Sequence, residues 1–218
     1  TKNDVTIIDK QYSHRANVTA RNMYRFKNEN GCITYQKGLC GDDGTLMFIV
    51  ETPGSFQGVL ERDIIQFGNL RVQMKFNGKQ FILGCNSGLE AILEAFKSYL
   101  CVIKWNRGNY IVSLSVYDYK HREDIPIYKL RPEMYWFDFE NPICEVVGVY
   151  NEDYNMREKL KCQIHSFPCF ITNIKYYNKA LDKQEAIKES VKYTTQHESC
   201  VINDLARKIN SGHGYAVR

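Results

Sequence analysis

The chain has 218 residues, of which 44% are hydrophobic and 25% charged, and its formal net charge is +4. These totals are typical of one globular domain with a real core. No window of the sequence approaches about 20 consecutive apolar residues, so we expect no membrane-spanning helix within the chain. The basic residues are scattered among acids, which favours a solvated, mixed-charge surface and no nucleic-acid partner. The chain begins at Thr1, so we expect a processed or trimmed product.

Residues 1–30 are polar and weakly periodic, and within them only Thr6–Ile8 resembles a short edge strand. Residues 31–44 contain cysteines and glycines and end in the turn signal Asp43-Gly44. We therefore predict that residues 1–44 form an N-terminal arm followed by a disulfide-tied loop.

Strand signals follow from residue 46. Leu46–Val50 is a short apolar run typical of a buried strand, and residues 63–67 form another short strand. Residues 70–76 alternate between apolar and polar side chains, and Asn77-Gly78 then predicts a tight hairpin into Phe81–Leu83.

The stretch after this hairpin has a helical pattern. Ser87 and Glu90 have the spacing of a capping box. The apolar residues that follow share one face at helical spacing: Leu89, Ile92, Leu93 and Phe96. We predict a short helix inserted between strands.

The next segments predict a hairpin, a long irregular stretch and more strands. The two strands of the hairpin are residues 100–105 and 110–117, with a turn at Arg107-Gly108-Asn109. Residues 118–142 are charged, interrupted by proline, and contain Tyr135-Trp136-Phe137. Strands are then expected over 145–150 and 161–164.

The stretch from Phe170 to Ile187 organises the end of the chain. Residues 170–177 are rich in β-branched and aromatic residues and predict a closing strand. Asn178 opens a turn, and Asp182 with Glu185 forms a capping-box pair that begins a helix. Helical pattern continues to about Ile209, with a break near 196–199.

This closing stretch reads I-x-x-I-x-Y-Y-N-x-A-L-x-x-x-E, and it resembles the closing motif of concanavalin-like, laminin-G-like jelly-roll domains. The matching residues are Ile171, Ile174, Tyr176, Tyr177, Asn178, Ala180, Leu181 and Glu185. Residues 101–119 are similar to the central hairpin of that family. The resemblance implies a mostly β, two-sheet antiparallel jelly-roll sandwich over 45–187, with a short inserted helix and a C-terminal helical extension over 188–218. The alternative is another antiparallel β domain that ends in a helix.

Eight cysteines, an even and dispersed set, indicate an oxidising compartment and disulfides. Cys32 with Cys40 and Cys162 with Cys169 are the local pairs to test first. Cys162, His165 and Cys169 also have ligand types that zinc accepts, with His197 and Cys200 further on; the alternative is disulfide-bonded or buried cysteines beside a surface histidine. Asn17-Val18-Thr19 is a glycosylation acceptor triplet, which fits secretion.

The sequence lacks the motifs of common enzymes. The E-x-D-x-x-E string of concanavalin-like glycoside hydrolases is absent, as are a nucleophile elbow, a phosphate-binding glycine loop and H-E-x-x-H. Calcium is the cofactor that the resembled fold often holds, and oxygen ligands are available although their spacing is not diagnostic: Asp42, Asp43, Asp138, Asn151, Glu152 and Asp153. We expect no catalytic residues and no obligatory cofactor.

Fifteen tyrosines and two tryptophans make aromatic contact the most distinctive feature of the chain. Trp105, Tyr135 and Trp136 are the candidate ligand-binding residues, with core filling as the alternative, favoured for Trp105. The resemblance implies a non-enzymatic recognition module that binds glycan or protein at an extracellular, cell or virion surface. The alternative is a structural subunit of a larger assembly, such as a virion coat or envelope complex, docking through its arm and C-terminal helices. A hydrolase without a recognisable motif is the third hypothesis.

Overall fold

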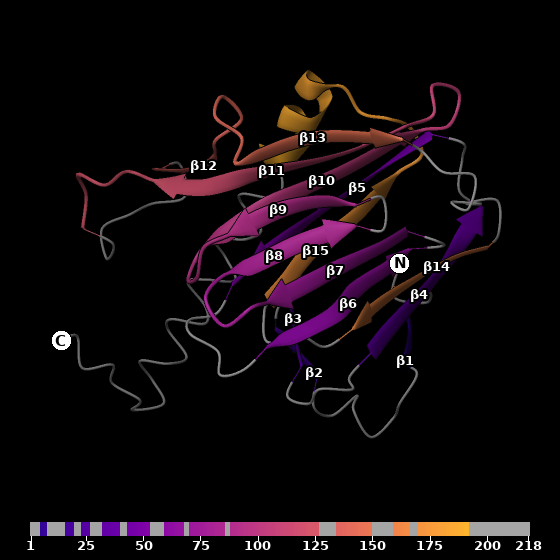
Figure 1. The fold of residues 1–218 in the computed structure, drawn as a ribbon, viewed down its shortest axis with the longest axis horizontal. Helices are drawn as coiled ribbons and strands as arrows, with labels where there is room; N and C mark the ends of the chain where they lie inside the picture. The colour runs from indigo at the N-terminus through magenta and orange to yellow at the C-terminus, as the bar shows by residue number, and fades with distance from the viewer. Residues whose placement is uncertain are drawn as a thin grey trace.

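The computed structural model describes residues 5–7, 16–19, 23–26, 32–39, 43–52, 59–67, 70–85, 88–126, 134–149, 159–165 and 170–191. These residues form two antiparallel sheets packed face to face, with a helix over residues 183–191 at the outer side of one sheet (Figure 1). The predicted two-sheet antiparallel sandwich is therefore confirmed. No helix in these ranges is both long and apolar enough to cross a membrane.

The order of strands in each sheet mixes distant parts of the chain. Sheet A runs β1 (Val5–Ile7), β4 (Cys32–Leu39), β14 (Lys159–His165), β6 (Leu60–Phe67), β7 (Leu70–Phe76), β8 (Phe81–Cys85), β9 (Leu89–Leu93). Sheet B runs β12 (Tyr135–Phe137), β11 (Ile111–His121), β10 (Ser98–Asn106), β5 (Asp43–Glu51), β15 (Phe170–Tyr177), β3 (Met23–Phe26), β2 (Ala16–Thr19). Strand β13 (Cys144–Val149) pairs with the first half of β11, and β12 pairs with its end.

The N-terminal segment differs from the predicted arm. Strands β1 and β4 belong to sheet A, and β2 and β3 belong to sheet B, so residues 1–44 contribute to both layers of the sandwich. The predicted edge strand near Thr6 is confirmed as β1, which pairs with β4. These strands are added through pairing with β14 and β15, which lie more than 100 residues later in the chain.

The predicted inserted helix is wrong. Residues 89–93 form β9, which pairs with β8 along its whole length. Its side chains alternate: Leu89, Ala91 and Leu93 are buried, whereas Glu90 and Ile92 are exposed. The alternation of buried and exposed side chains every two residues therefore identifies this element as a strand. The apolar side chain of Ile92, 59% exposed, produced the misleading helical spacing.

The main core lies between the two sheets and continues on the outer face of sheet B. Strand β5 is buried on both faces. Its residues Leu46, Phe48 and Val50 belong to the cluster between the sheets. Met47 and Ile49 belong to a second cluster, where Leu181 and Ala186 cover them. This double burial explains the uninterrupted apolar run of β5.

The closing motif is held to β5 by hydrogen bonds. The hydroxyl of buried Thr45 donates to the carbonyl of Lys179 at 2.8 Å and accepts from the backbone N–H of Leu181 at 2.9 Å. The following helix begins with the predicted capping box: Asp182 N–H donates to Glu185 Oε2 at 3.0 Å, and Glu185 N–H donates to Asp182 Oδ1 at 2.8 Å. The strand, turn and helix start predicted over 170–187 are confirmed.

Candidate ligand-binding rim

Strand β12 lies at an edge of sheet B and presents two different faces. Its register with β11 places Phe137 opposite Tyr119, Trp136 opposite Lys120 and Tyr135 opposite His121. Residues directly opposite one another in an antiparallel pair share a face, and successive residues alternate between faces. One face is therefore aromatic, and the other combines Trp136 with charged residues.

The aromatic face is a stack of rings. Tyr119 and Tyr135 lie nearly parallel, with ring centroids 5.3 Å apart and an interplanar angle of 10°. His121 lies 5.8 Å from Tyr135, and Phe137 lies 4.8 Å from Tyr119. Phe137 is buried in the outer cluster of sheet B, whereas Tyr135 is half-buried. The stack therefore anchors β12 through Phe137 and leaves Tyr135 partly accessible to solvent.

The opposite face carries Trp136 beside an ion pair. Trp136 is 43% exposed. Lys120, its cross-strand partner, donates from Nζ to Asp138 Oδ2 at 2.6 Å, and Asn141 N–H donates to Asp138 Oδ1 at 3.1 Å. The hydrogen bond with Lys120 lowers the pKa of Asp138 and raises the pKa of Lys120. Both groups stay charged at neutral pH, so a fixed ion pair lies on the same face as the indole.

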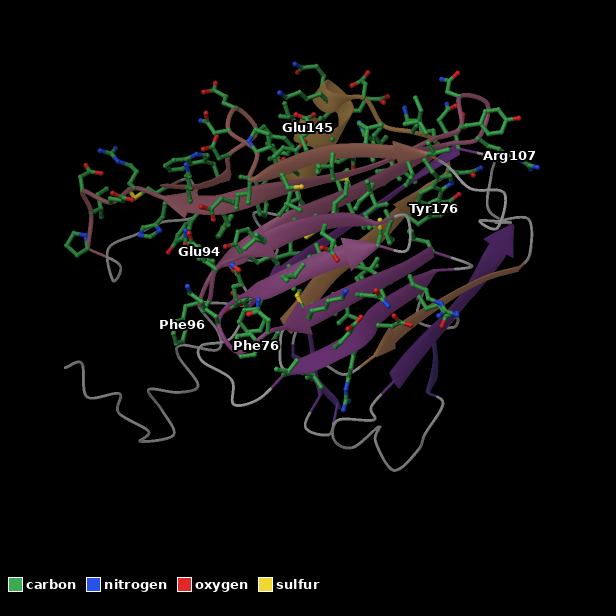
Figure 2. The ribbon with its side chains drawn as sticks, in the orientation of Figure 1. Phe76, Glu94, Phe96, Arg107, Glu145 and Tyr176 are labelled. Atoms are coloured by element: carbon green, nitrogen blue, oxygen red, sulfur yellow. The ribbon has the colours of Figure 1, made fainter. Side chains whose placement is uncertain are left out.

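The turn between β9 and β10 lies at the same end of the sandwich and carries Phe96. Figure 2 shows Glu94 and Phe96 at the end toward which β11 runs. Lys97 links this turn to β11, because its Nζ lies 3.6 Å from Asp118 and 2.7 Å from Glu94. We call Phe96, Tyr135 and Trp136, three aromatic residues at this end of the sandwich that are exposed or half-buried, the aromatic rim.

Phe96 is held outward by its turn. Its side chain is 82% exposed, and its backbone φ of 58° lies in the left-handed region, which costs a non-glycine residue about 1–2 kcal/mol. Two buried hydroxyls stabilise the turn. The Thr52 hydroxyl donates to the Glu94 carbonyl at 2.6 Å and accepts from Lys97 N–H at 3.1 Å. Tyr99 Oη accepts from Glu94 N–H at 2.9 Å.

We expect Thr52→Val to lower the free energy of unfolding by about 1–2 kcal/mol, because it leaves the Lys97 N–H and the Glu94 carbonyl without their buried partner. Valine has nearly the volume of threonine, so the loss reports the hydroxyl rather than a cavity. Urea unfolding measures it. Thr52→Ser, which keeps the hydroxyl, should retain most of the stability; an equal loss in both variants would contradict the role given to the hydrogen bonds.

Trp105, predicted as a ligand-binding residue, is a core residue instead. Its side chain is 2% exposed and belongs to the cluster between the sheets. The indole stacks on Tyr176, with ring centroids 5.9 Å apart and an interplanar angle of 7°. It also lies directly on β5, since a Cβ built on Gly44 would come within 2.2 Å of Cζ2. No ligand can reach the ring while the sandwich is closed.

Three of the eight cysteines have described side chains, and they are not joined by disulfides. Cys85, Cys101 and Cys144, the cysteines whose side chains are described, are thiols, and the first two are buried in the core. Cys32 begins β4, which is extended to Leu39. The pairing of Cys32 with Cys40 stays a prediction, because Cys40 lies outside the described residues. Cys162 lies in β14; Cys40 and Cys169 lie outside the described residues.

The remaining predicted sites are distributed over the fold. Asn17 lies on β2, at the edge of sheet B opposite to β12. Asp138, a proposed calcium ligand, is engaged by Lys120 and Asn141. Asp43 is described in β5, whereas the other proposed calcium ligands lie outside the described ranges, as do His197 and Cys200. Within those ranges, no three His, Cys, Asp or Glu side chains are placed to hold a metal.

The sequence prediction does not include Phe96 of the aromatic rim, nor Tyr119 and His121 of the ring stack beside it. The spacing of residues 89–96 predicts a helix face for Phe96, although Glu94 and Lys97 beside it are typical of a solvent-exposed turn. Tyr119 and His121 lie two and four residues after Tyr117 in the same alternating strand, so period two could have predicted that they share a face.

Comparison with known proteins shows no family for this chain. No family model matches the chain, and no curated protein matches it. Among solved structures, the binding domain of botulinum neurotoxin DC in complex with rat synaptotagmin II has 8% identity and a TM-score of 0.49, covering 88% of this chain and 46% of that one. A botulinum neurotoxin type C structure, described as dependent on two ganglioside molecules for cell entry, has 8% identity and a TM-score of 0.48, covering 78% and 42%.

Mouse laminin α1 domains LG4–5 have 11% identity and a TM-score of 0.41, covering 77% of this chain and 44% of theirs. This chain thus spans less than half the length of the neurotoxin and laminin structures. With identities of 8–11% and TM-scores of 0.41–0.49, these structures show neither a family nor a function for this chain.

Proposed function

We propose that this chain is a non-enzymatic recognition module that binds a glycan at the aromatic rim, at an extracellular, cell or virion surface. The observation that carries the proposal is Trp136, a large aromatic side chain left 43% exposed on an edge strand beside the Lys120–Asp138 ion pair. Exposed tryptophan next to fixed polar groups is typical of a binding surface rather than of a solvated edge.

The chemistry of the rim suits a sugar. A pyranose ring has a face of C–H groups, which packs on an indole or phenyl ring, and an edge of hydroxyls, which need both donors and acceptors. Trp136 offers a ring, while Lys120, opposite Trp136 on β11, and its partner Asp138 offer a donor and an acceptor on the same face. The charges occur as paired ions of opposite sign, so the rim favours neutral hydroxyls over a strongly anionic ligand.

A protein ligand fits the described rim less well. Protein interfaces of standard size bury about 800 Å² on each partner around an apolar centre. The rim instead combines two exposed aromatic residues, Phe96 and Trp136, with the ionised side chains of Lys97 and Lys120 and their carboxylate partners. This arrangement matches a small amphipathic ligand better than a broad apolar one.

We expect Trp136→Ala to weaken glycan binding about tenfold or more, with little change in folding, because the side chain is exposed. A glycan array on the purified 218-residue chain would identify ligands, and calorimetric titration would measure the dissociation constants. Tyr110→Ala is the matched control, because Tyr110 is 58% exposed in the β10–β11 turn, at the other end of β11. Its dissociation constant should equal that of the wild-type chain.

Two results would contradict the proposal. If the wild-type chain binds no glycan, the proposal that its ligand is a glycan is wrong. If the chain binds a protein but no glycan, the protein-ligand alternative is favoured. Equal losses of glycan affinity in Trp136→Ala and Tyr110→Ala would show that the rim is not the binding site.

The second candidate function, a subunit of a larger assembly, is favoured by a separate surface on sheet B.

A further inference from the structure

A second exposed surface lies on the outer face of sheet B, at β11 and β13. The register pairs Ile111 with Val149 and Ser113 with Val147. These positions share a face with Tyr117, which belongs to the outer cluster of this sheet. Ile111, Val147 and Val149 are 42%, 65% and 75% exposed. We call these three residues the outer stripe.

The described covering of sheet B stops short of the outer stripe. The outer cluster, which includes Leu181 and Ala186 near the helix, contains none of its three residues. Among the described strands, β13 pairs with β11 alone, so its other side is a sheet edge. Adjacent exposed valines on an edge strand are a surface that proteins normally cover.

Charges at the two ends of the outer stripe are of opposite sign. Glu145, exposed, begins the same face of β13, and Arg107 lies in the hairpin beside the other end of the strand. Figure 2 shows Glu145 and Arg107 apart along β13. A twofold axis near Val147 would bring the acidic end of one copy against the basic end of the other, while the valines pack together. The surface is therefore complementary to itself.

We propose that the outer stripe is the interface of a homodimer, with a second copy of this chain as its occupant. The contact is isologous: Val147 lies near the axis, and Glu145 of each copy faces Arg107 of its partner. The aromatic rims of the two copies lie away from this contact. Each dimer would therefore present two glycan sites and could bind a glycan-bearing surface bivalently.

The test uses the 218-residue chain in sedimentation equilibrium and light scattering over a wide concentration range. We expect a monomer–dimer equilibrium, which Val147→Lys weakens about tenfold or more, because each dimer contains the substitution twice. Val59→Lys is the matched control: Val59 is 80% exposed at the start of sheet A strand β6, and its replacement should leave the dimer unchanged. Thermal unfolding confirms that both variants remain folded.

Charge reversal tests the orientation. Glu145→Arg alone should weaken the dimer, and the double variant Glu145→Arg with Arg107→Glu should restore it. A wild-type chain that is monomeric at every concentration would overturn the proposal, whether the stripe is solvated or covered by another part of the chain. Equal effects of Val147→Lys and Val59→Lys would overturn it too, because association would then be unspecific.

Discussion

Replacing Trp105 by alanine is expected to lower the free energy of unfolding by about 3–5 kcal/mol, the usual cost of deleting a large aromatic side chain from a core. The indole is 2% exposed, stacks on Tyr176 and lies against the backbone of β5 at Gly44. These neighbours belong to two other strands of sheet B, β15 and β5, so they cannot both collapse into the cavity. Urea unfolding of the variant and of the wild-type chain measures the loss.

Trp136→Ala is the control for this loss, because it makes the same substitution at the other tryptophan. It should cost less than about 1 kcal/mol, since Trp136 is 43% exposed. The two variants should then separate stability from binding: Trp105→Ala unfolds more easily, and Trp136→Ala binds glycan more weakly while it stays folded. Similar stability losses at both positions would show that the two indoles do not have these different roles.

The sequence predicts the alternation of β10 and β11 but not which face becomes the inside of the sandwich. Trp105 alternates with Lys104 and Asn106, so period two establishes that one face is apolar. A second sheet turns that face into a core, and its presence depends on strands far away in the chain. Trp105 and Trp136 differ in their solvent exposure, and no local sequence pattern predicts that difference.

The error at residues 87–96 has a similar cause. The sequence LEAIL fits a strand with Leu89, Ala91 and Leu93 inward, and it also fits a helix with Ile92 on the apolar face. The pairing of β9 with β8 settles the choice in favour of the strand. The capping-box spacing of Ser87 and Glu90 was misleading, because capping residues favour a helix only where tertiary pairing does not compete.

Where local interactions decide, the sequence was sufficient. The hairpin at Asn77-Gly78 forms as predicted: Gly78 has a φ of 90°, and Asn77 Oδ1 accepts hydrogen bonds from the backbone of Lys79 and Gln80. The capping box of Asp182 and Glu185 forms reciprocally. Of the aromatic rim, the sequence predicts Tyr135 and Trp136, because they lie in a charged, proline-flanked stretch, although Phe137 of the same run is buried in the outer cluster. Phe96 could not be predicted, because a distant strand, through Thr52, fixes its turn.

Alkaline pH is expected to destabilise the chain through Tyr99. This side chain is fully buried, and burial raises its pKa from 10.0 to about 12. Below pH 10, the phenol is neutral in the folded and the unfolded chain, so its full contribution to stability is present. Between pH 10 and pH 12 the unfolded chain loses the proton first, which favours unfolding. Stability therefore falls as pH rises, by about 2–3 kcal/mol over this range, since one pKa unit corresponds to about 1.4 kcal/mol.

Tyr99→Phe isolates this contribution. The variant loses the acceptor of the Glu94 N–H and should be about 1 kcal/mol less stable at neutral pH. It has no proton to lose at position 99, so its unfolding free energy should fall less steeply between pH 10 and pH 12. Equal slopes in the wild-type chain and Tyr99→Phe would contradict the assignment. Because Tyr99 and Thr52 together hold the turn of Phe96, the alkaline loss of stability begins at the structure that supports the aromatic rim.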